Sequence, residues 1–223
     1  MPIWASRSGL QGIRIPKRLW KGSGKATFAY RFVNCNEISV INQRFLNKTI
    51  LTPNDDLQRA FDAAVPGSRF YLEAGVYRQK VLLCTPGLQI EGTGINQTTI
   101  IWDDYANKLH EDGQEYNTFR TYTMAICADH VSMRNLSIIN DAGHPENKGA
   151  LSVLGNDFLM ENCRLSSTQD TLFAGPLPSD LIARYKHFLI DNLRAPGPFR
   201  QRYTRCLIEG SFLILQKAPE HII

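Results

Sequence analysis

The chain has 223 residues, of which 43% are hydrophobic and 21% are charged, with a formal net charge of +4. This composition is ordinary for a globular protein, and the length is sufficient for one substantial hydrophobic core. No stretch approaches the roughly 18 unbroken apolar residues of a membrane span, so we expect no membrane partner. The basic N-terminus is followed by no apolar run with a small-residue cleavage site, so no signal peptide is predicted.

Basic residues are concentrated near the N-terminus. Residues 1–50 contain nine Lys or Arg and a single acid, Glu37, whereas residues 51–223 contain 16 basic and 20 acidic residues. Such a segment is typical of a solvated extension, or of a patch that binds nucleic acid or another acidic polymer. The acidic remainder argues against a nucleic-acid-binding protein. We therefore predict a basic extension at 1–50 and one folded domain at 51–223.

The first clear element is a short helix at about 56–64. Asn54 or Asp55 can cap it, because their side-chain oxygens accept hydrogen bonds from the free N–H groups of a first turn. The sequence Val65-Pro66-Gly67 would end the helix. Its apolar face would hold Leu57, Ala60, Phe61 and Ala64.

From residue 69 onward, short apolar runs alternate with turn residues. Most have four to eight residues and a period of two, which predicts β-strands. No long amphipathic helices separate them, which disfavours a doubly wound α/β sheet. The runs span 69–77, 80–83, 87–92, 98–102, 124–128, 130–139, 150–155, 157–165, 171–175 and 202–210.

Three of these runs share one internal shape. Each alternates apolar residues and then has a polar residue before a small apolar one, with Asn135, Asn162 and Arg205 at that step. Repeats at uneven offsets are typical of a solenoid whose coils carry loops of different lengths. The alternative is an antiparallel sandwich. The longest interruption, 174–200, would form a loop with a short helix near 180–187, and such loops often wall a groove.

Metal and disulfide chemistry is not indicated. The five cysteines form no CxxC pair and their odd number excludes a complete disulfide framework, so we predict buried free thiols. The five histidines show no HExxH or HxH spacing, so no metal and no cofactor is expected. Asp103-Asp104 would suit a paired-carboxylate glycosidase, but a solvated loop is the better interpretation.

The most informative short segment is Gln169-Asp170, directly after a predicted strand. A side-chain amide can donate hydrogen bonds to a developing oxyanion, and a neighbouring carboxyl can carry a proton. The alternative is a turn in which Asp170 caps backbone N–H groups.

Six segments in order resemble the pectinesterase (pectin methylesterase) family. They lie between residues 75 and 210, and Gln169–Phe173 is close to the family's QDTLY. The others are Gly75–Val81, Ile90–Gly94 continuing to Ile100, Thr121–Ala125, Asn140–Gly143 and Arg202–Gly210.

This resemblance implies an all-β, right-handed, single-stranded parallel β-helix that removes methyl groups from esterified polygalacturonate, the pectin of cell walls. It implies Asp170 as the general acid and base, with Gln169 and Asn147 as oxyanion donors. Phe173, Thr123 and Tyr77 would contact the substrate, and for Tyr77 packing in the core is an equal alternative. It implies no cofactor, a monomer, and the extracellular or cell-wall location that is usual in the family.

The sequence departs from the family at two places in the site. Asn147 stands where the family has a glutamine that is longer by one methylene. The family's nucleophilic aspartate would fall near Leu213, and the chain reaches Ile223 before the family's LGRPW segment. Because leucine cannot attack a carbonyl, we expect weak or no esterase activity and a β-helix incomplete at its C-terminal end. The alternatives are a non-catalytic polysaccharide-binding β-helix, or a lyase or glycosidase, for which no calcium-binding or close carboxylate set is evident.

Overall fold

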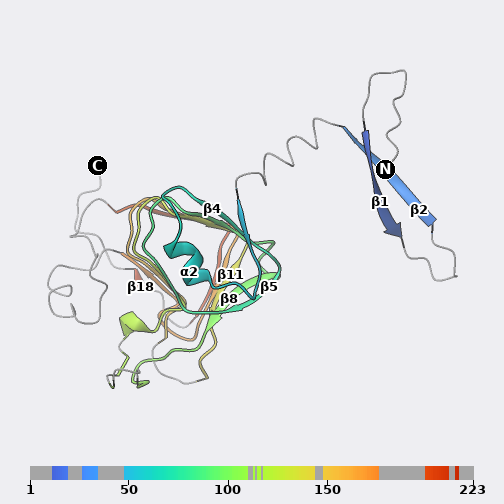
Figure 1. Ribbon diagram of the computed structural model, residues 1–223. Helices are drawn as coiled ribbons and strands as arrows, with labels where there is room; N and C mark the ends of the chain where they lie inside the picture. Colours follow the sequence, from blue (N-terminus) through green and yellow to red (C-terminus); the bar gives the residue numbers. More distant parts are fainter. Residues whose placement is uncertain are drawn as a thin grey trace. The chain divides into compact units, whose positions relative to one another are not determined.

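The computed structural model (Figure 1) describes residues 12–19, 27–34, 48–109, 113, 115–116, 118–143, 148–175, 199–210 and 214–215. The chain divides into two compact units, 1–48 and 49–223. The predicted helix near 180–187 lies outside the described residues.

The N-terminal unit contains an antiparallel pair of strands. β1 (Gly12–Leu19) pairs with β2 (Thr27–Asn34), with Ile13 opposite Val33. From the sequence we predicted a basic extension here and assigned it no secondary structure. The missed signal is the period-two spacing of Ile13 and Ile15, and of Phe28, Tyr30 and Phe32, which favours strands even among many charges.

The second unit is a parallel β-helix, which confirms the predicted fold class. Its strands form three sheets in which the neighbours are parallel and come from successive turns of the chain. Parallel crossovers of this kind are right-handed. In the part of unit 2 that the structure describes, no antiparallel ladder of strands occurs beyond the isolated bridge Leu109–Glu115, so the antiparallel sandwich is excluded.

The three sheets are named by their order along each coil. The first contains β3 (Thr49–Leu51), β4 (Arg69–Leu72), β7 (Gln89–Glu91), β10 (Ser132–Arg134), β13 (Phe158–Glu161) and β16 (Gln201–Thr204). The second contains β5 (Gly75–Arg78), β8 (Thr98–Trp102), β11 (Ser137–Asn140), β14 (Arg164–Ser166) and β17 (Leu207–Glu209). The third contains β6 (Val81–Leu83), β9 (Met124–Ile126), β12 (Leu151–Val153), β15 (Leu172–Ala174) and β18 (Ile214–Leu215).

The core is a column of stacked apolar side chains. In the first sheet the pairing places Ile90, Met133 and Met160 in one inward row. In the third sheet Val81, Met124, Leu151 and Leu172 form another inward row. Because successive residues of a strand point to opposite faces, the residues between them face outward.

The corners of the coil explain the repeated polar step. Asn135, Asn162 and Arg205 all have φ between 50° and 58°, a left-handed conformation that asparagine tolerates better than most residues. Asn162 Nδ2 donates to Asn135 Oδ1 at 2.8 Å, so the corner side chains bond from coil to coil. Each corner divides a run that the sequence presents as continuous, and 130–139 therefore forms both β10 and β11.

The predicted helix is present as α2 (Leu57–Asp62) and lies across the end of the coil (Figure 1). Leu57 and Phe61 are buried, as predicted from its apolar face. Its cap is Asp56, whose side chain accepts from the N–H of Arg59, and not Asn54 or Asp55. Asp55 instead accepts from the Thr52 N–H and hydroxyl, which closes the preceding turn and lowers the pKa of Asp55.

Three further findings concern the described residues only. Cys163 is buried and free as predicted, but Cys84 is exposed and Cys127 and Cys206 are partly buried, which corrects the expectation of buried thiols. Across that part of the chain, no helix has the length and hydropathy to cross a membrane. The same residues contain no group of three potential metal ligands.

Candidate functional site

Asp170 lies at the corner between β14 and β15, immediately before the third sheet. Its φ of 38° is left-handed, a conformation in which Asp and Asn are enriched. The residue is only 8% exposed. Burial raises the pKa of its carboxyl, because a charged carboxylate loses hydration there. A carboxyl with a raised pKa can both donate and accept a proton nearer neutral pH.

Gln169 places an amide beside this carboxyl. Its Oε1 atom is buried and has no hydrogen-bond partner among the described residues. An unsatisfied buried polar atom costs about 1–3 kcal/mol, so its retention needs a reason such as a ligand. Two residues before Gln169, the Ser167 hydroxyl donates to the Lys148 carbonyl at 3.0 Å, which ties this corner to the preceding coil.

Lys148 was not among the residues that we predicted for this site. It is only 1% exposed, and its Nζ donates to the Ala142 carbonyl. Burial lowers the pKa of this lysine, since the ammonium is the form that loses hydration. The only sequence feature that could have pointed to Lys148 as a site residue is its position directly after Asn147. Nothing in the neighbouring sequence indicates that Lys148 is buried.

Asn140 joins the segments behind the site. Its Nδ2 donates to the carbonyls of Asp104, Thr121 and Gly149 at 2.9, 2.8 and 3.1 Å. Its Oδ1 accepts from the Ala142 N–H at 3.1 Å. The Asn140–Gly143 segment, which the sequence marked without a role, thus fixes the backbone next to the site. A Cβ placed on Gly149 would lie 3.6 Å from the Asp170 carbonyl, so the two corners are adjacent.

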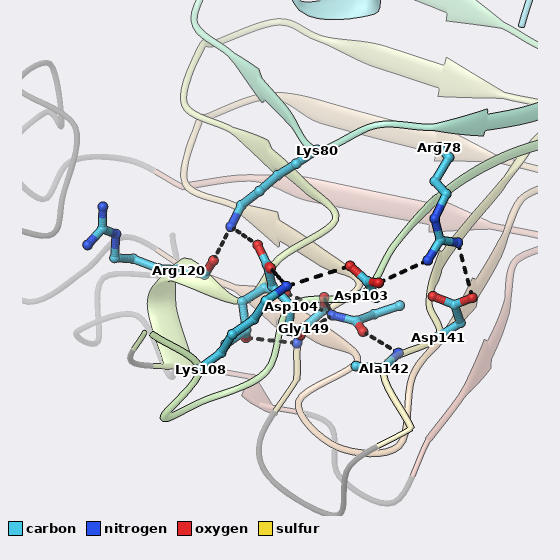
Figure 2. Close-up of polar contacts among 11 residues, drawn as sticks. Arg78, Lys80, Asp103, Asp104, Lys108, Arg120, Asp141, Ala142 and Gly149 are labelled. Atoms are coloured by element: carbon cyan, nitrogen blue, oxygen red, sulfur yellow. Dashed lines mark hydrogen bonds and ion pairs between the residues drawn. The ribbon is translucent and has the colours of Figure 1, made fainter. Parts of the chain in front are cut away.

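The backbone that Asn140 joins at Asp104, Thr121 and Gly149 is called the wall of the site. A buried ion cluster at Asp104 supports this wall (Figure 2). The Asp104 carboxylate lies 2.6 Å from Lys80 Nζ and 2.7 Å from Lys108 Nζ, with its side chain 3% exposed. This burial corrects the solvated-loop interpretation for Asp104, whereas the Asp103 side chain is 42% exposed. The reason is that Lys80, far away in sequence, reaches Asp104 from the preceding coil.

The pKa values in this cluster follow from burial and pairing. Burial would raise the pKa of Asp104, but hydrogen bonds from Lys108 and Lys80 outweigh it and lower that pKa. Burial dominates for Lys80 and lowers its pKa despite the Asp104 partner. The more exposed Lys108 has a raised pKa, because the contribution of Asp104 outweighs the cost of burial. Asp104 therefore stays ionised.

Aromatic residues cover part of the outer face of the third sheet. Phe173 faces outward, half-buried, and its ring meets Phe119 edge to face at 5.9 Å between centroids. Phe119 belongs to the short 3₁₀ helix η1 (Thr118–Arg120). Lys80 Nζ lies 4.5 Å from the Tyr116 ring centroid and 4.8 Å from that of Tyr122. The surface thus combines aromatic faces with ammonium groups.

Two of the residues predicted to contact the substrate, Thr123 and Tyr77, are buried away from the surface of the site. Thr123 is fully buried and its hydroxyl donates to the Ile139 carbonyl, so it supports the wall rather than facing a ligand. Tyr77 is also fully buried in the row that continues with Ile100, and its hydroxyl donates to the Leu51 and Glu73 carbonyls. The substrate contact predicted for Tyr77 is therefore corrected.

Two sequence-based assignments cannot be placed. Asn147, the predicted second oxyanion donor, and Leu213, at the family's nucleophile position, lie outside the described residues. The described part of the site is Gln169, Asp170 and Phe173, supported by Lys148.

Curated relatives of known name share part of this chain. Pectinesterase QRT1 of Arabidopsis thaliana is 30% identical over 115 residues, which cover 47% of this chain and 30% of that protein. Pectinesterase 2 of Citrus sinensis is 30% identical over 123 residues, covering 52% of this chain and 23% of that protein. The chain thus matches less than a third of the length of either relative.

Solved structures share the fold. A pectin methylesterase mutant in complex with a hexasaccharide has a TM-score of 0.57 at 20% identity, covering 70% of this chain and 45% of that one. Pectin methylesterase PemA from Erwinia chrysanthemi has a TM-score of 0.57 at 18% identity, covering 73% and 49%. The enzyme from carrot has a TM-score of 0.54 at 22% identity, covering 72% and 46%.

The family comparison spans most of the described coil. The model of the pectinesterase family matches residues 47–176, which is more than half of the chain and includes Gln169, Asp170 and Phe173. The chain belongs to the pectinesterase family.

Proposed function

We propose that this chain is a slow carboxylic ester hydrolase acting on methyl-esterified polygalacturonate, with Asp170 as the proton-transferring group. The observation that carries the proposal is the buried, raised-pKa carboxyl of Asp170 directly beside the side-chain amide of Gln169. Two curated relatives are named as pectinesterases, and one solved relative holds a hexasaccharide.

The chemistry follows from these two side chains. The Asp170 carboxylate accepts a proton from a water molecule as the water oxygen attacks the ester carbonyl. The Gln169 amide N–H donates to the carbonyl oxygen, where negative charge develops. Asp170 then gives its proton to the departing methoxide, so methanol leaves and the galacturonic acid product loses its remaining proton to solvent, which gives the carboxylate. No covalent intermediate is needed, which is consistent with leucine at the position of the family's nucleophile.

Slow turnover follows from the missing nucleophile. General acid and base catalysis contributes about 10²–10⁴-fold in typical enzymes, whereas a covalent route divides one difficult step into two easier ones. Without a carboxylate at residue 213, this chain would retain only the first contribution. The substrate surface we propose is the outer face of the third sheet, where Phe173 is half-exposed.

The test measures methanol released from esterified pectin by the purified chain and by Asp170→Asn. Asparagine keeps the shape and tolerates the left-handed backbone, but it cannot carry the proton. We expect methanol release by the wild type to be slow but measurable, and release by the variant to be at least tenfold slower. Asp157→Asn is the matched control, because Asp157 also has positive φ (53°) but lies at a different corner of the coil. Equal rates for the wild type and Asp170→Asn would contradict the proposal.

A second candidate is pectin binding without turnover. Leu213 at the nucleophile position favours it, and the aromatic pair Phe119–Phe173 offers a surface on which sugar rings can stack. Affinity electrophoresis in pectin gels separates the candidates. Retarded migration without methanol release supports binding alone, whereas unretarded migration excludes it.

A further inference from the structure

We propose that Cys84 and Cys127 form a reversible disulfide that joins two successive coils on the outer face of the third sheet. The inference concerns the fold and the thiols only, and it does not depend on esterase activity. The oxidant we name is a small-molecule disulfide such as oxidised glutathione.

The strand pairing places the two cysteines side by side. Leu83 of β6 pairs in register with Ile126 of β9, and Cys84 and Cys127 are the next residues of their strands. The Cys127 N–H donates to the Leu83 carbonyl at 2.9 Å, so the register holds up to the cysteines. Neighbouring strands lie about 4.8 Å apart, within the Cα separation of about 4.4–6.8 Å that a disulfide requires.

Both side chains point to the same face of the sheet. Val81, Leu83, Met124 and Ile126 point into the core, with none of their surface exposed. The alternation of a strand therefore turns Cys84 and Cys127 outward. Cys84 is exposed and Cys127 is partly buried, so a soluble oxidant can reach the Cys84 thiol more readily than the Cys127 thiol.

The contact between the thiols prepares one of them for attack. The interaction between the two thiols lowers the pKa of Cys84 and, together with burial, raises the pKa of Cys127. The thiolate is the nucleophile in disulfide exchange. Cys84 is thus the attacking residue, and Cys127 is the residue that closes the bond.

The exchange balances in two steps. The Cys84 thiolate attacks one sulfur of oxidised glutathione, forming a mixed disulfide and releasing one glutathione thiolate. Cys127 gives up its proton to solvent and attacks the Cys84 sulfur, which releases the second glutathione. Two protein thiols are oxidised to one disulfide, and one glutathione disulfide is reduced to two glutathione molecules.

The chain contains a matched pair that should not react. Cys163 and Cys206 also lie between strands that pair in register, and the Leu207 N–H donates to the Cys163 carbonyl at 2.9 Å. Cys163 is 1% exposed, and burial raises its pKa to about 12. Its thiol donates to the Glu161 carbonyl. Equal register with opposite exposure makes this pair the internal control.

The crosslink would close the chain around the segment that forms the wall. Residues between the two cysteines include Asp104 and Tyr122, and the bond would hold β6 to β9 independently of that segment.

The test incubates the folded chain, in a Cys35→Ser background, with oxidised glutathione and then alkylates the remaining thiols. Peptide mass spectrometry should find Cys84 and Cys127 joined, with a loss of two hydrogen masses, while Cys163 and Cys206 remain alkylated. Reductant should reverse the change. Cys127→Ser should stop at the mixed disulfide on Cys84, and Cys84→Ser should react at least tenfold more slowly.

Four outcomes overturn the proposal. They are free Cys84 and Cys127 after prolonged oxidation, a stable mixed disulfide on Cys84 in the parent chain, a crosslink between two chains through Cys84, or equal oxidation of Cys163 and Cys206. Thermal unfolding gives a separate readout. The oxidised parent should melt several degrees above the reduced form, and this difference should disappear in Cys127→Ser.

Discussion

The Asp104 cluster allows a sharp test of how the wall of the site is held. In Asp104→Asn, the shape of the side chain is kept but its charge is removed. Lys80 then loses a carboxylate at 2.6 Å, and Lys108 loses one at 2.7 Å. Lys80 keeps the Arg120 carbonyl and two aromatic rings, which do not neutralise it.

The magnitude follows from burial. Removing one partner of a buried ion pair costs about 3–5 kcal/mol, because the remaining charge is left uncompensated. The Lys80 side chain is 22% exposed and the Lys108 side chain is 34% exposed, so water relieves part of this cost. We expect a loss of about 3 kcal/mol in the free energy of unfolding. With a urea dependence of about 2 kcal/mol per molar, the unfolding midpoint should fall by about 1.5 M.

Asp103→Asn is the control in the next residue. Asp103 lies 2.9 Å from an Arg78 nitrogen and 3.7 Å from Lys108 Nζ, but its side chain is 42% exposed. Exposed pairs contribute about 0–1 kcal/mol, so its midpoint should fall by less than about 0.5 M at the same urea dependence. Equal midpoints for the two variants would refute the reasoning that burial decides the value of these pairs.

The pH dependence of the Asp104 effect has a definite sign. The pairing lowers the pKa of Asp104 in the folded state below its ordinary value of 3.8. A carboxyl of this kind stabilises the fold above its unfolded pKa, and the contribution is lost as the pH falls through the folded pKa. The difference between wild type and Asp104→Asn should therefore be full at pH 7 and shrink steadily below pH 3.8.

Three further predictions concern the corners, the core and the site. Asn162→Ala should lower the free energy of unfolding in urea by about 1–2 kcal/mol, because it removes the hydrogen bond to Asn135 and places alanine in a left-handed backbone. Arg205→Asn should raise that free energy by about 1 kcal/mol, because asparagine tolerates the left-handed backbone better than arginine. Tyr77→Phe should lose about 1–2 kcal/mol of unfolding free energy but leave pectin-gel migration unchanged, since its hydroxyl bonds only to backbone carbonyls of the core. Asp170→Asn should be more stable than wild type at pH 7 and equal to it below pH 3.8. The raised pKa of this carboxyl destabilises the charged form as pH rises, and a larger gain at low pH would contradict that sign.

The coil was predictable because its signals are local. Period-two runs predict strands, and the polar residues at 135, 162 and 205 mark positions where a left-handed corner is needed. The corners were not recognised as breaks, so 130–139 and 157–165 were each predicted as one strand. The strands β1 and β2 are not predicted, because residues 1–50 as a whole lack a clear periodicity.

The site was only partly predictable. Gln169 and Asp170 form one short motif, and the corner between β14 and β15 holds them together. Burial of Asp104 and Lys148 is not local, because it depends on residues that stacking brings from other coils. The exposure of Cys84 likewise depends on which face of β6 points outward, and this is fixed only when the sheet forms.

The two buried aspartates near the wall differ in their electrostatic surroundings. Asp104 and Asp170 are both buried, yet pairing lowers the pKa of the first and burial raises that of the second. The difference lies in the cations, since two lysine ammonium groups touch Asp104 and no described lysine or arginine forms an ion pair with Asp170. A carboxylate that stays charged can stabilise the wall through ion pairs, but it accepts and donates protons poorly. Asp170, whose two protonation states are closer in free energy near neutral pH, is the carboxyl from which proton transfer is to be expected.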